Sequence, residues 1–171
     1  MKKTIYFFIA IALTTFGCGR HYIPPCCTAN RAAVATAQKN GVLWSPIGVG
    51  GSIYQDTYFN LAAGNYLMNG AYTKIDSLNI ETPTSDPGTY KLHSGDVFYA
   101  TFANGTETDY KLDTTYNNVM NITSFQILDQ SSGVEMREAE VKGTFNLKFI
   151  DPANPTGITF SNGSFYTIFL H

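Results

Sequence analysis

The chain has 171 residues and a formal net charge of −2 at pH 7, and only 14% of its residues are charged. This slightly acidic, charge-poor composition excludes a nucleic-acid-binding protein, which needs a surface rich in Lys and Arg. Because 44% of the residues are hydrophobic, the composition also excludes a disordered chain, and the length favours a single domain.

The N-terminus resembles a bacterial signal peptide. Two lysines precede an apolar run, residues 5–16, which is too short to cross a bilayer as a helix but suits a signal-peptide core. The run ends in Gly17-Cys18, a small residue followed by Cys, as in the lipobox of bacterial lipoproteins, with Thr15 where Leu is usual. We expect residues 1–17 to be a signal peptide and Cys18 to receive a diacylglycerol. The alternative is ordinary cleavage, with Cys18 as a spare thiol.

Residues 18–30 have the composition of a linker, in which Pro24-Pro25 favours an extended chain. Cys26 and Cys27 are adjacent, and their Cα atoms, about 3.8 Å apart, are closer than the roughly 4.4–6.8 Å usual in disulfides. Together with His21 they match no zinc-binding spacing. For the domain of residues 31–171 we therefore expect no internal disulfide, no metal site and no cofactor.

The first element of the domain is open to two interpretations. The alanines of residues 32–38 suit a short helix that stops at Asn40-Gly41. Asn-Gly between two strand-like runs is also a strong indicator of a type I′ hairpin turn. We favour the hairpin, in which residues 34–38 pair with residues 42–44.

Strands and turns then alternate at intervals of about ten residues. Asn104-Gly105 predicts a second hairpin, residues 83–88 predict a loop, and Gly143 predicts a bulge. The run of residues 165–170 is apolar on both faces, as in a central strand that is covered on both sides. The expected strands are residues 52–54, 58–62, 73–81, 89–92, 97–103, 106–112, 122–129, 135–150 and 158–170.

No amphipathic helix separates these strands, which excludes a parallel sheet built from strand–helix–strand units. The spacing instead predicts an all-β domain, either a single antiparallel β-sandwich or a partly open barrel.

Four stretches of the domain stand out by their content, order and spacing. They are AQKNGVLWSP (residues 37–46), PGTYKL (87–92), ITSFQILDQSSG followed by VKGTFNLKF (122–149), and ITFSNGSFYTIF (158–169). In these stretches the chain resembles small lipoproteins of Bacteroidota that form a family of unknown function. The resemblance implies a β-rich fold and a location in the cell envelope, and no reaction or catalytic residue comes with it.

Two tripeptides are also consistent with an origin in Bacteroidota. Asp76-Ser77-Leu78 and Asp113-Thr114-Thr115 look like the O-glycosylation signal of that phylum, which makes Ser77 and Thr114 candidate glycosylation sites. No acidic residue directly follows Cys18, which argues against retention in the inner membrane, and no acidic surface-export cluster follows it. The resemblance therefore implies the outer membrane, with the periplasmic face favoured over the cell surface.

Candidate catalytic residues are few. His93 lies in a segment whose Ser, Gly and Asp are typical of a tight turn. Glu138 and Glu140 would share one face of a strand, where we expect a solvated edge rather than paired catalytic carboxylates. Asp151 and Asn154 lie in a loop but match no calcium-binding motif. We therefore expect that the protein is not an enzyme.

Aromatic residues are concentrated in one part of the domain. Exposed Tyr and Trp side chains can stack on sugar rings or anchor a protein interface, although in a β domain they more often pack in the core. The candidate contact surface consists of Trp44, Tyr54, Tyr58, Tyr66 and Tyr72.

These observations together predict an envelope-anchored, non-enzymatic binding or accessory module, with an envelope protein or a small molecule as its partner. Two alternatives stay open, a structural subunit of an outer-membrane complex and a hydrolase of glycans or lipids. A deep pocket would favour a ligand binder or an enzyme. A flat exposed apolar patch would favour a protein partner.

Overall fold

The computed structural model describes residues 33–54, 58–68, 72–104, 106–128, 138–151 and 153–170. These residues form strands, turns and bends, and none of them lies in a helix. The predicted all-β class is therefore confirmed. It follows that the described residues contain no helix of the length and hydrophobicity that crossing a membrane requires.

The eleven described strands follow one another along the chain with short connections. They are β1 (Val34–Lys39), β2 (Val42–Trp44), β3 (Gly48–Tyr54), β4 (Tyr58–Met68), β5 (Tyr72–Thr82), β6 (Gly88–Lys91), β7 (Val97–Ala103), β8 (Thr106–Leu112), β9 (Val119–Ile127), β10 (Glu138–Asp151) and β11 (Asn154–Leu170).

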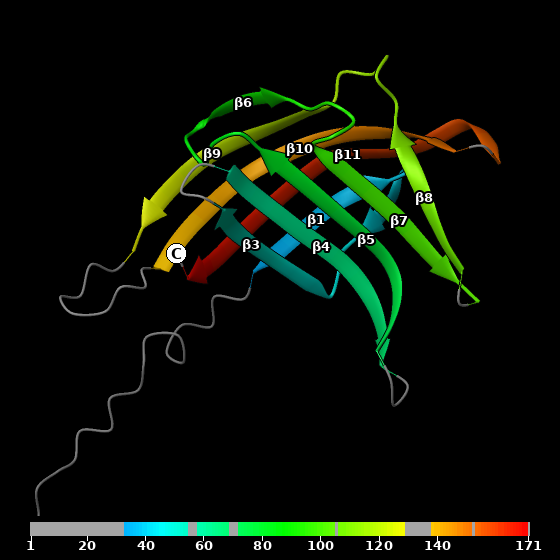
Figure 1. Cartoon of the computed structure of the whole chain (residues 1–171), viewed down its shortest axis with the longest axis horizontal. Coiled ribbons are helices and arrows are strands. Elements are labelled where there is room, and N and C mark those ends of the chain that lie inside the picture. The colour runs from blue at the N-terminus through cyan, green and yellow to red at the C-terminus, as the bar shows by residue number, and fades with distance from the viewer. Residues whose placement is uncertain are drawn as a thin grey trace, which may run out of the picture. The chain divides into compact units, whose positions relative to one another are not determined.

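All eleven strands belong to one antiparallel sheet that curls into a half-barrel (Figure 1). The hydrogen-bonded order is β2-β1-β11-β10-β8-β7-β5-β4-β3, while β9 pairs with β10 and carries β6 on its other side. The sheet divides at β10, because residues 139–146 of this strand pair with β9 and Phe149 and Ile150 pair with β8. We call β1, β2, β6, β9, β10 and β11 the first layer, and β3, β4, β5, β7 and β8 the second layer.

The core lies between the two layers and is rich in aromatic rings. Tyr99 of the second layer is fully buried and contacts Phe149 and Phe160 of the first layer, with ring centroids 5.2 and 5.1 Å apart. Trp44 packs edge-on against the same Phe160 at 5.1 Å. These contacts join the β1–β2 hairpin and both layers into one core.

The hairpin favoured for residues 34–44 is confirmed, and the helix alternative is wrong. Ala37 pairs with Trp44 and Lys39 with Val42, around a turn in which Asn40 and Gly41 both have positive φ, +51° and +81°. Two successive positive φ angles are what a type I′ turn requires, and Asn-Gly adopts them at the lowest cost. The second predicted hairpin is confirmed by the pairing of β7 with β8.

Irregularities in the long strands allow the sheet to bend. The register between β9 and β10 shifts between Lys142 and Gly143, which confirms the predicted bulge. A second shift lies between β10 and β11, where Asn162 has a φ of +52° and its amide donates to Asn146 Oδ1 at 3.0 Å. Bulges of this kind increase the local twist, and twist is what curls a long sheet.

The open edge of the second layer lies against the first. β3 contacts β11, and a Cβ placed on Gly51 would come within 2.7 Å of Thr167 Oγ1 and 2.8 Å of the Phe169 ring. Only a glycine permits this close approach. β11 itself is paired with β1 on one side and β10 on the other, so it is central, as its apolar end predicted.

Candidate functional site

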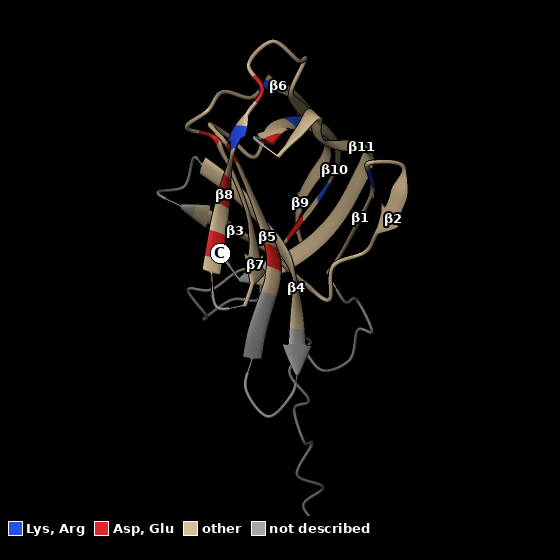
Figure 2. Ribbon diagram, turned by 90° about the vertical axis from the view of Figure 1, so that its right-hand side faces the viewer, with Lys and Arg blue, Asp and Glu red and all other residues tan. Residues whose placement is uncertain are grey.

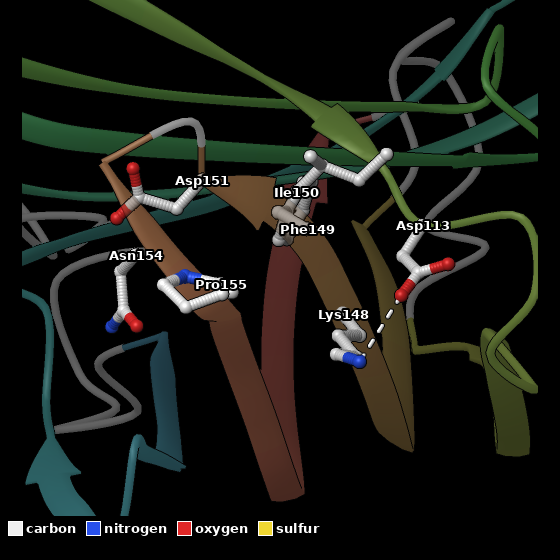
Figure 3. A pocket seen from close by; sticks show the side chains of 8 residues that line it. Asp113, Lys148, Phe149, Ile150, Asp151, Asn154 and Pro155 are labelled. Carbon is white, nitrogen blue, oxygen red and sulfur yellow. Dashed lines mark ion pairs between the residues drawn. The ribbon is translucent and has the colours of Figure 1, made fainter.

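A shallow notch of about 100 Å³ lies where β8, β10 and β11 meet (Figure 3). Its lining residues come from the end of β8, the end of β10 and the start of β11. They are Asp113, Lys148, Phe149, Ile150, Asp151, Asn154, Pro155 and Gly157. At this volume the notch fits a small polar group, not a drug-sized ligand, which needs about 300 Å³ or more.

The strongest charge interaction in the notch joins Asp113 and Lys148. Lys148 Nζ is 3.1 Å from Asp113 Oδ2, and Figure 3 shows the two side chains facing each other. Thr115 donates to Asp113 Oδ1 from its hydroxyl at 2.6 Å and from its backbone amide at 3.0 Å. These hydrogen bonds from Thr115, with the help of Lys148, lower the pKa of Asp113 below its usual value.

Asn118 fixes the loop that carries this ion pair. Its side chain is 1% exposed, donates to the Asp113 carbonyl at 2.7 Å and accepts from the Lys148 amide at 2.8 Å. One buried amide therefore connects the loop after β8 with β10. Nothing in the sequence pattern around Asn118 pointed to this role, because its two partners lie 5 and 30 residues away.

The polar oxygens on the other side of the notch are used in local turns. Asp151 Oδ1 accepts from the Ala153 amide at 2.9 Å, and Asn154 Oδ1 accepts from the Thr156 amide and hydroxyl at 3.1 and 2.8 Å. Within the described part of the chain, no group of three His, Cys, Asp or Glu side chains is arranged to hold a metal ion. The notch is thus a structured loop junction with one ion pair.

His93 lies in the tight turn that its neighbours predicted. The Asp96 amide donates to the His93 carbonyl at 3.0 Å, and Asp96 Oδ2 accepts from the His93 amide at 2.7 Å and lies 3.2 Å from the ring Nδ1. His93 is exposed. The Asp side chain therefore acts as a turn-forming group here.

A second polar cluster is buried between the two layers, centred on Asp76 of β5. Asp76 is 4% exposed. Asp76 Oδ2 accepts from Trp44 Nε1 at 3.0 Å and lies 3.5 Å from Lys39 Nζ. Asp76 Oδ1 accepts from the backbone and side-chain nitrogens of Asn65, each at 3.0 Å. The carboxylate thereby ties β1, β2 and β4 to β5.

Tyr99 lies beside this cluster. Lys39 Nζ is 5.2 Å from the centroid of the Tyr99 ring, a cation–π distance. Burial, and next to it the Asp76 carboxylate, raises the pKa of Tyr99, so that its phenol stays neutral. Among the described residues its hydroxyl finds no hydrogen-bond partner. The groups of this cluster contact one another across four strands, so the cluster holds the two layers together.

We expected a solvated edge at Glu140 of β10, but this residue is only 5% exposed, although its side chain points away from the core. Lys142 Nζ is 2.7 Å from Glu140 Oε1, and the Tyr166 hydroxyl donates to Oε2 at 3.0 Å. The ammonium of Lys142 also lies 5.3 Å from the centre of the Tyr166 ring. The solvated edge expected here is therefore wrong for Glu140.

The two candidate glycosylation sites differ in their exposure to solvent. Ser77 is 6% exposed in the middle of β5, paired with Gly64 of β4 and Ala100 of β7. Thr114 is exposed in the loop that follows β8. In the folded domain only Thr114 is accessible to a glycosyltransferase, so the prediction is kept for Thr114 alone.

The candidate aromatic surface is not one continuous surface. Trp44 is 5% exposed and belongs to the core, which corrects its assignment to a contact surface. Tyr58 is 40% exposed, and Tyr66 is half-buried, with its ring over Gly48, where a Cβ would come within 2.7 Å of it. The side chains of Tyr54 and Tyr72 lie outside the described ones. The predictions for Cys18, for the signal peptide and for the linker also fall outside the described residues.

One family model matches the chain. It is described as a domain of unknown function, DUF6252, and it matches residues 30–169, which include almost all the described strands. No curated protein and no solved structure matches the chain. The comparisons therefore bring no activity with them.

Proposed function

Because the chain belongs to the DUF6252 family, a domain of unknown function, we propose a function from its own residues. The protein is a lipoprotein of the Bacteroidota type, anchored by Cys18 in the outer membrane and facing the periplasm. Its β-domain is a non-enzymatic binding or accessory module for an envelope protein or a small ligand.

The observation that carries this proposal is the sequence before the domain. A basic start, a short apolar run and Gly17-Cys18 are the parts that lipoprotein processing requires. The described fold begins at residue 33, so about fifteen residues are left to serve as a tether between Cys18 and β1. An anchored domain of this kind acts by holding a binding surface near a membrane.

The domain has the features of a rigid scaffold for such a surface. Its two layers share one aromatic core, and its hairpins β1–β2, β7–β8 and β10–β11 extend toward the same side of the domain (Figure 1). Loops displayed by a rigid β framework are a common place for recognition. The exposed Thr114, in the loop that follows β8, is the residue at which we propose an O-glycan.

The test is the mass and the partners of the protein in its native membranes. Wild type, Cys18→Ser and the matched linker variant Cys26→Ser are each purified with mild detergent. We expect a lipid mass on wild type and Cys26→Ser but not on Cys18→Ser, and we expect partners to be recovered only with the lipidated forms. A wild-type protein without lipid would refute the anchor. A lipidated protein that always occurs in one fixed complex would favour a structural subunit instead.

A further inference from the structure

The β1–β2 hairpin displays three aliphatic side chains to solvent. Val42, Leu43 and Ile47 are 70%, 67% and 73% exposed, more than any other large hydrophobic side chain that the structure describes. They lie within six consecutive positions, on the edge strand β2 and the loop that leads to β3. Single exposed aliphatic residues need no explanation, whereas three at one tip do.

This tip is held firmly by the rest of the hairpin. Between Leu43 and Ile47, Trp44 is buried, packs on Phe160 and donates to Asp76. Lys39, at the other side of the turn, forms the ion pair with the same Asp76. The aliphatic side chains are therefore exposed on a fixed backbone. Leu43 lies on the face of β2 opposite to Trp44, and Val42 lies at the start of the strand, beside the turn.

The edge lacks the charges that usually protect such a strand. Natural sheet edges often carry charged residues, especially Lys, that oppose association. Residues 33–54 contain no Asp or Glu, and their single charged residue, Lys39, is already paired with Asp76. Figure 2 shows β2 at the margin of the sheet without any charged residue. An unprotected apolar edge of this kind is expected to be covered in the cell.

The size of the apolar tip favours a lipid bilayer over a protein as the cover. Three aliphatic side chains expose on the order of a few hundred Å² at most. A specific protein interface buries roughly 1,200 Å² or more in total. A bilayer requires no complementary partner surface, and an uncharged, acid-free segment can enter its interface at low cost.

The length of the chain before the domain permits this contact. From Cys18 to Val34 the chain can extend at most about 55 Å, at roughly 3.3–3.6 Å per residue. Because β1 has six residues, its start lies about 20 Å from the hairpin turn. The tether is thus longer than the distance from the start of β1 to the tip, so the tip can reach the surface that holds Cys18.

We propose that the β1–β2 hairpin inserts Val42, Leu43 and Ile47 into the interface of the bilayer that anchors Cys18. This inference rests on the proposed lipid anchor and adds a second, non-covalent contact to it. Two contacts fix the orientation of the domain, with β2 toward the membrane, whereas a lipid on a flexible tether does not.

The experiment places a tryptophan at the tip of the lipidated protein. Leu43→Trp is compared with Ile127→Trp, which substitutes an aliphatic residue of β9 that is 38% exposed and pairs with Ala139, at the end of β10 far from its turn into β11. Both proteins are reconstituted in phospholipid vesicles with plain or brominated acyl chains, and the emission of wild type, whose only tryptophan is Trp44, is subtracted. We expect the tryptophan introduced by Leu43→Trp to be shifted to the blue and quenched by bromine. The one introduced by Ile127→Trp stays unquenched.

Flotation of wild type and Cys18→Ser with the same vesicles tests the anchor separately. If wild type is lipidated and floats but the tryptophan of Leu43→Trp is not quenched, the hairpin contact is refuted and the anchor stands. A blue shift that depends on protein concentration without vesicles would assign the tip to a second copy of the chain and also refute the membrane contact. If Cys18 carries no lipid, both proposals fail.

Discussion

At the scale of single residues, the carboxylate of Asp76 is the connection on which the β1–β2 hairpin depends. It receives hydrogen bonds from Trp44 and Asn65 and the charge of Lys39, so strands β1, β2, β4 and β5 meet at one side chain. A buried carboxylate is tolerated only when its oxygens are satisfied in this way. Removing it leaves an indole N–H and an amide without partners in a buried place.

We therefore expect Asp76→Ala to lower the free energy of unfolding by about 2–4 kcal/mol, the range found when one partner of a buried charged network is lost. Urea unfolding followed by the emission of Trp44 measures this change. The control is Asp109→Ala on β8, an exposed aspartate, for which a change within about 0.5 kcal/mol is expected. Equal effects of the two substitutions would mean that the Asp76 network contributes nothing to stability.

A second prediction concerns Asp113 and the dependence of folding stability on pH. The hydrogen bonds from Thr115 and the contact with Lys148 lower the pKa of this carboxyl in the folded state. The folded protein then binds fewer protons at this site than the unfolded chain, so stability rises with pH. This contribution is fully present above the ordinary aspartate pKa of about 4 and is lost as the pH falls through the lower folded value.

Asp113→Asn removes this titration and should flatten the acid side of the stability profile. We expect the urea midpoint of the wild type to fall more steeply than that of Asp113→Asn as the pH is lowered from about 6 to 3. The two proteins should approach each other at the acid end. Parallel profiles over the whole range would show that the Thr115 and Lys148 contacts do not act on this carboxyl.

At the scale of elements, the long strands depend on positions where a side chain cannot fit. A Cβ on Gly143 of β10 would meet the Asn121 carbonyl and would come within 2.5 Å of the Phe165 ring. The bulge beside Gly143 brings the backbone of β9 and the ring from β11 onto this site together. A larger residue would have to push apart two neighbouring strands.

Gly143→Ala should consequently destabilise the domain by about 2–3 kcal/mol, which is the cost of overpacking a rigid core. Gly50→Ala on β3 is the matched control, because a Cβ there meets no atom within 4 Å. It should be neutral or slightly stabilising, since alanine reduces the freedom of the unfolded chain. Thermal unfolding of the two variants compares them directly. A Gly143→Ala protein as stable as Gly50→Ala would contradict the close approach.

The elements also show what local sequence can predict. Asn40, Asn104 and Asn162 precede Gly and have nearly the same φ, +51°, +52° and +52°. The first two lie in hairpin turns and the third in a bulge within β11. The sequence predicted the two Asn-Gly hairpin turns, which require positive φ angles, and the continuous last strand, but not the positive φ of Asn162. It did not predict the start of β3 at Gly48, because glycines have low strand propensity and this strand is stabilised by close packing on β11.

At the candidate sites the sequence was less informative, for a physical reason. Trp44, Asp76 and Glu140 are polar or amphipathic residues whose burial depends on partners from other strands. Trp44 and Asp76 are 32 positions apart, and Glu140 and Tyr166 are 26 apart. Local pattern gives the direction of a side chain from its strand, but not which other strand will cover it. That depends on strand order, which the alternation of residues leaves open.

At the scale of the whole molecule, the two layers should unfold as one unit. Phe160 of the first layer contacts Trp44 on one side and Tyr99 of the second layer on the other, and Asp76 joins β5 to the β1–β2 hairpin. Neither layer can separate without exposing this shared core. We expect Trp44 emission, which reports the hairpin, and far-UV circular dichroism, which reports all strands, to give the same urea midpoint. An earlier change in Trp44 emission would mean that the hairpin opens before the sheet. In that case the tip formed by Val42, Leu43 and Ile47 would lack a fixed base, which its proposed contact with the bilayer requires.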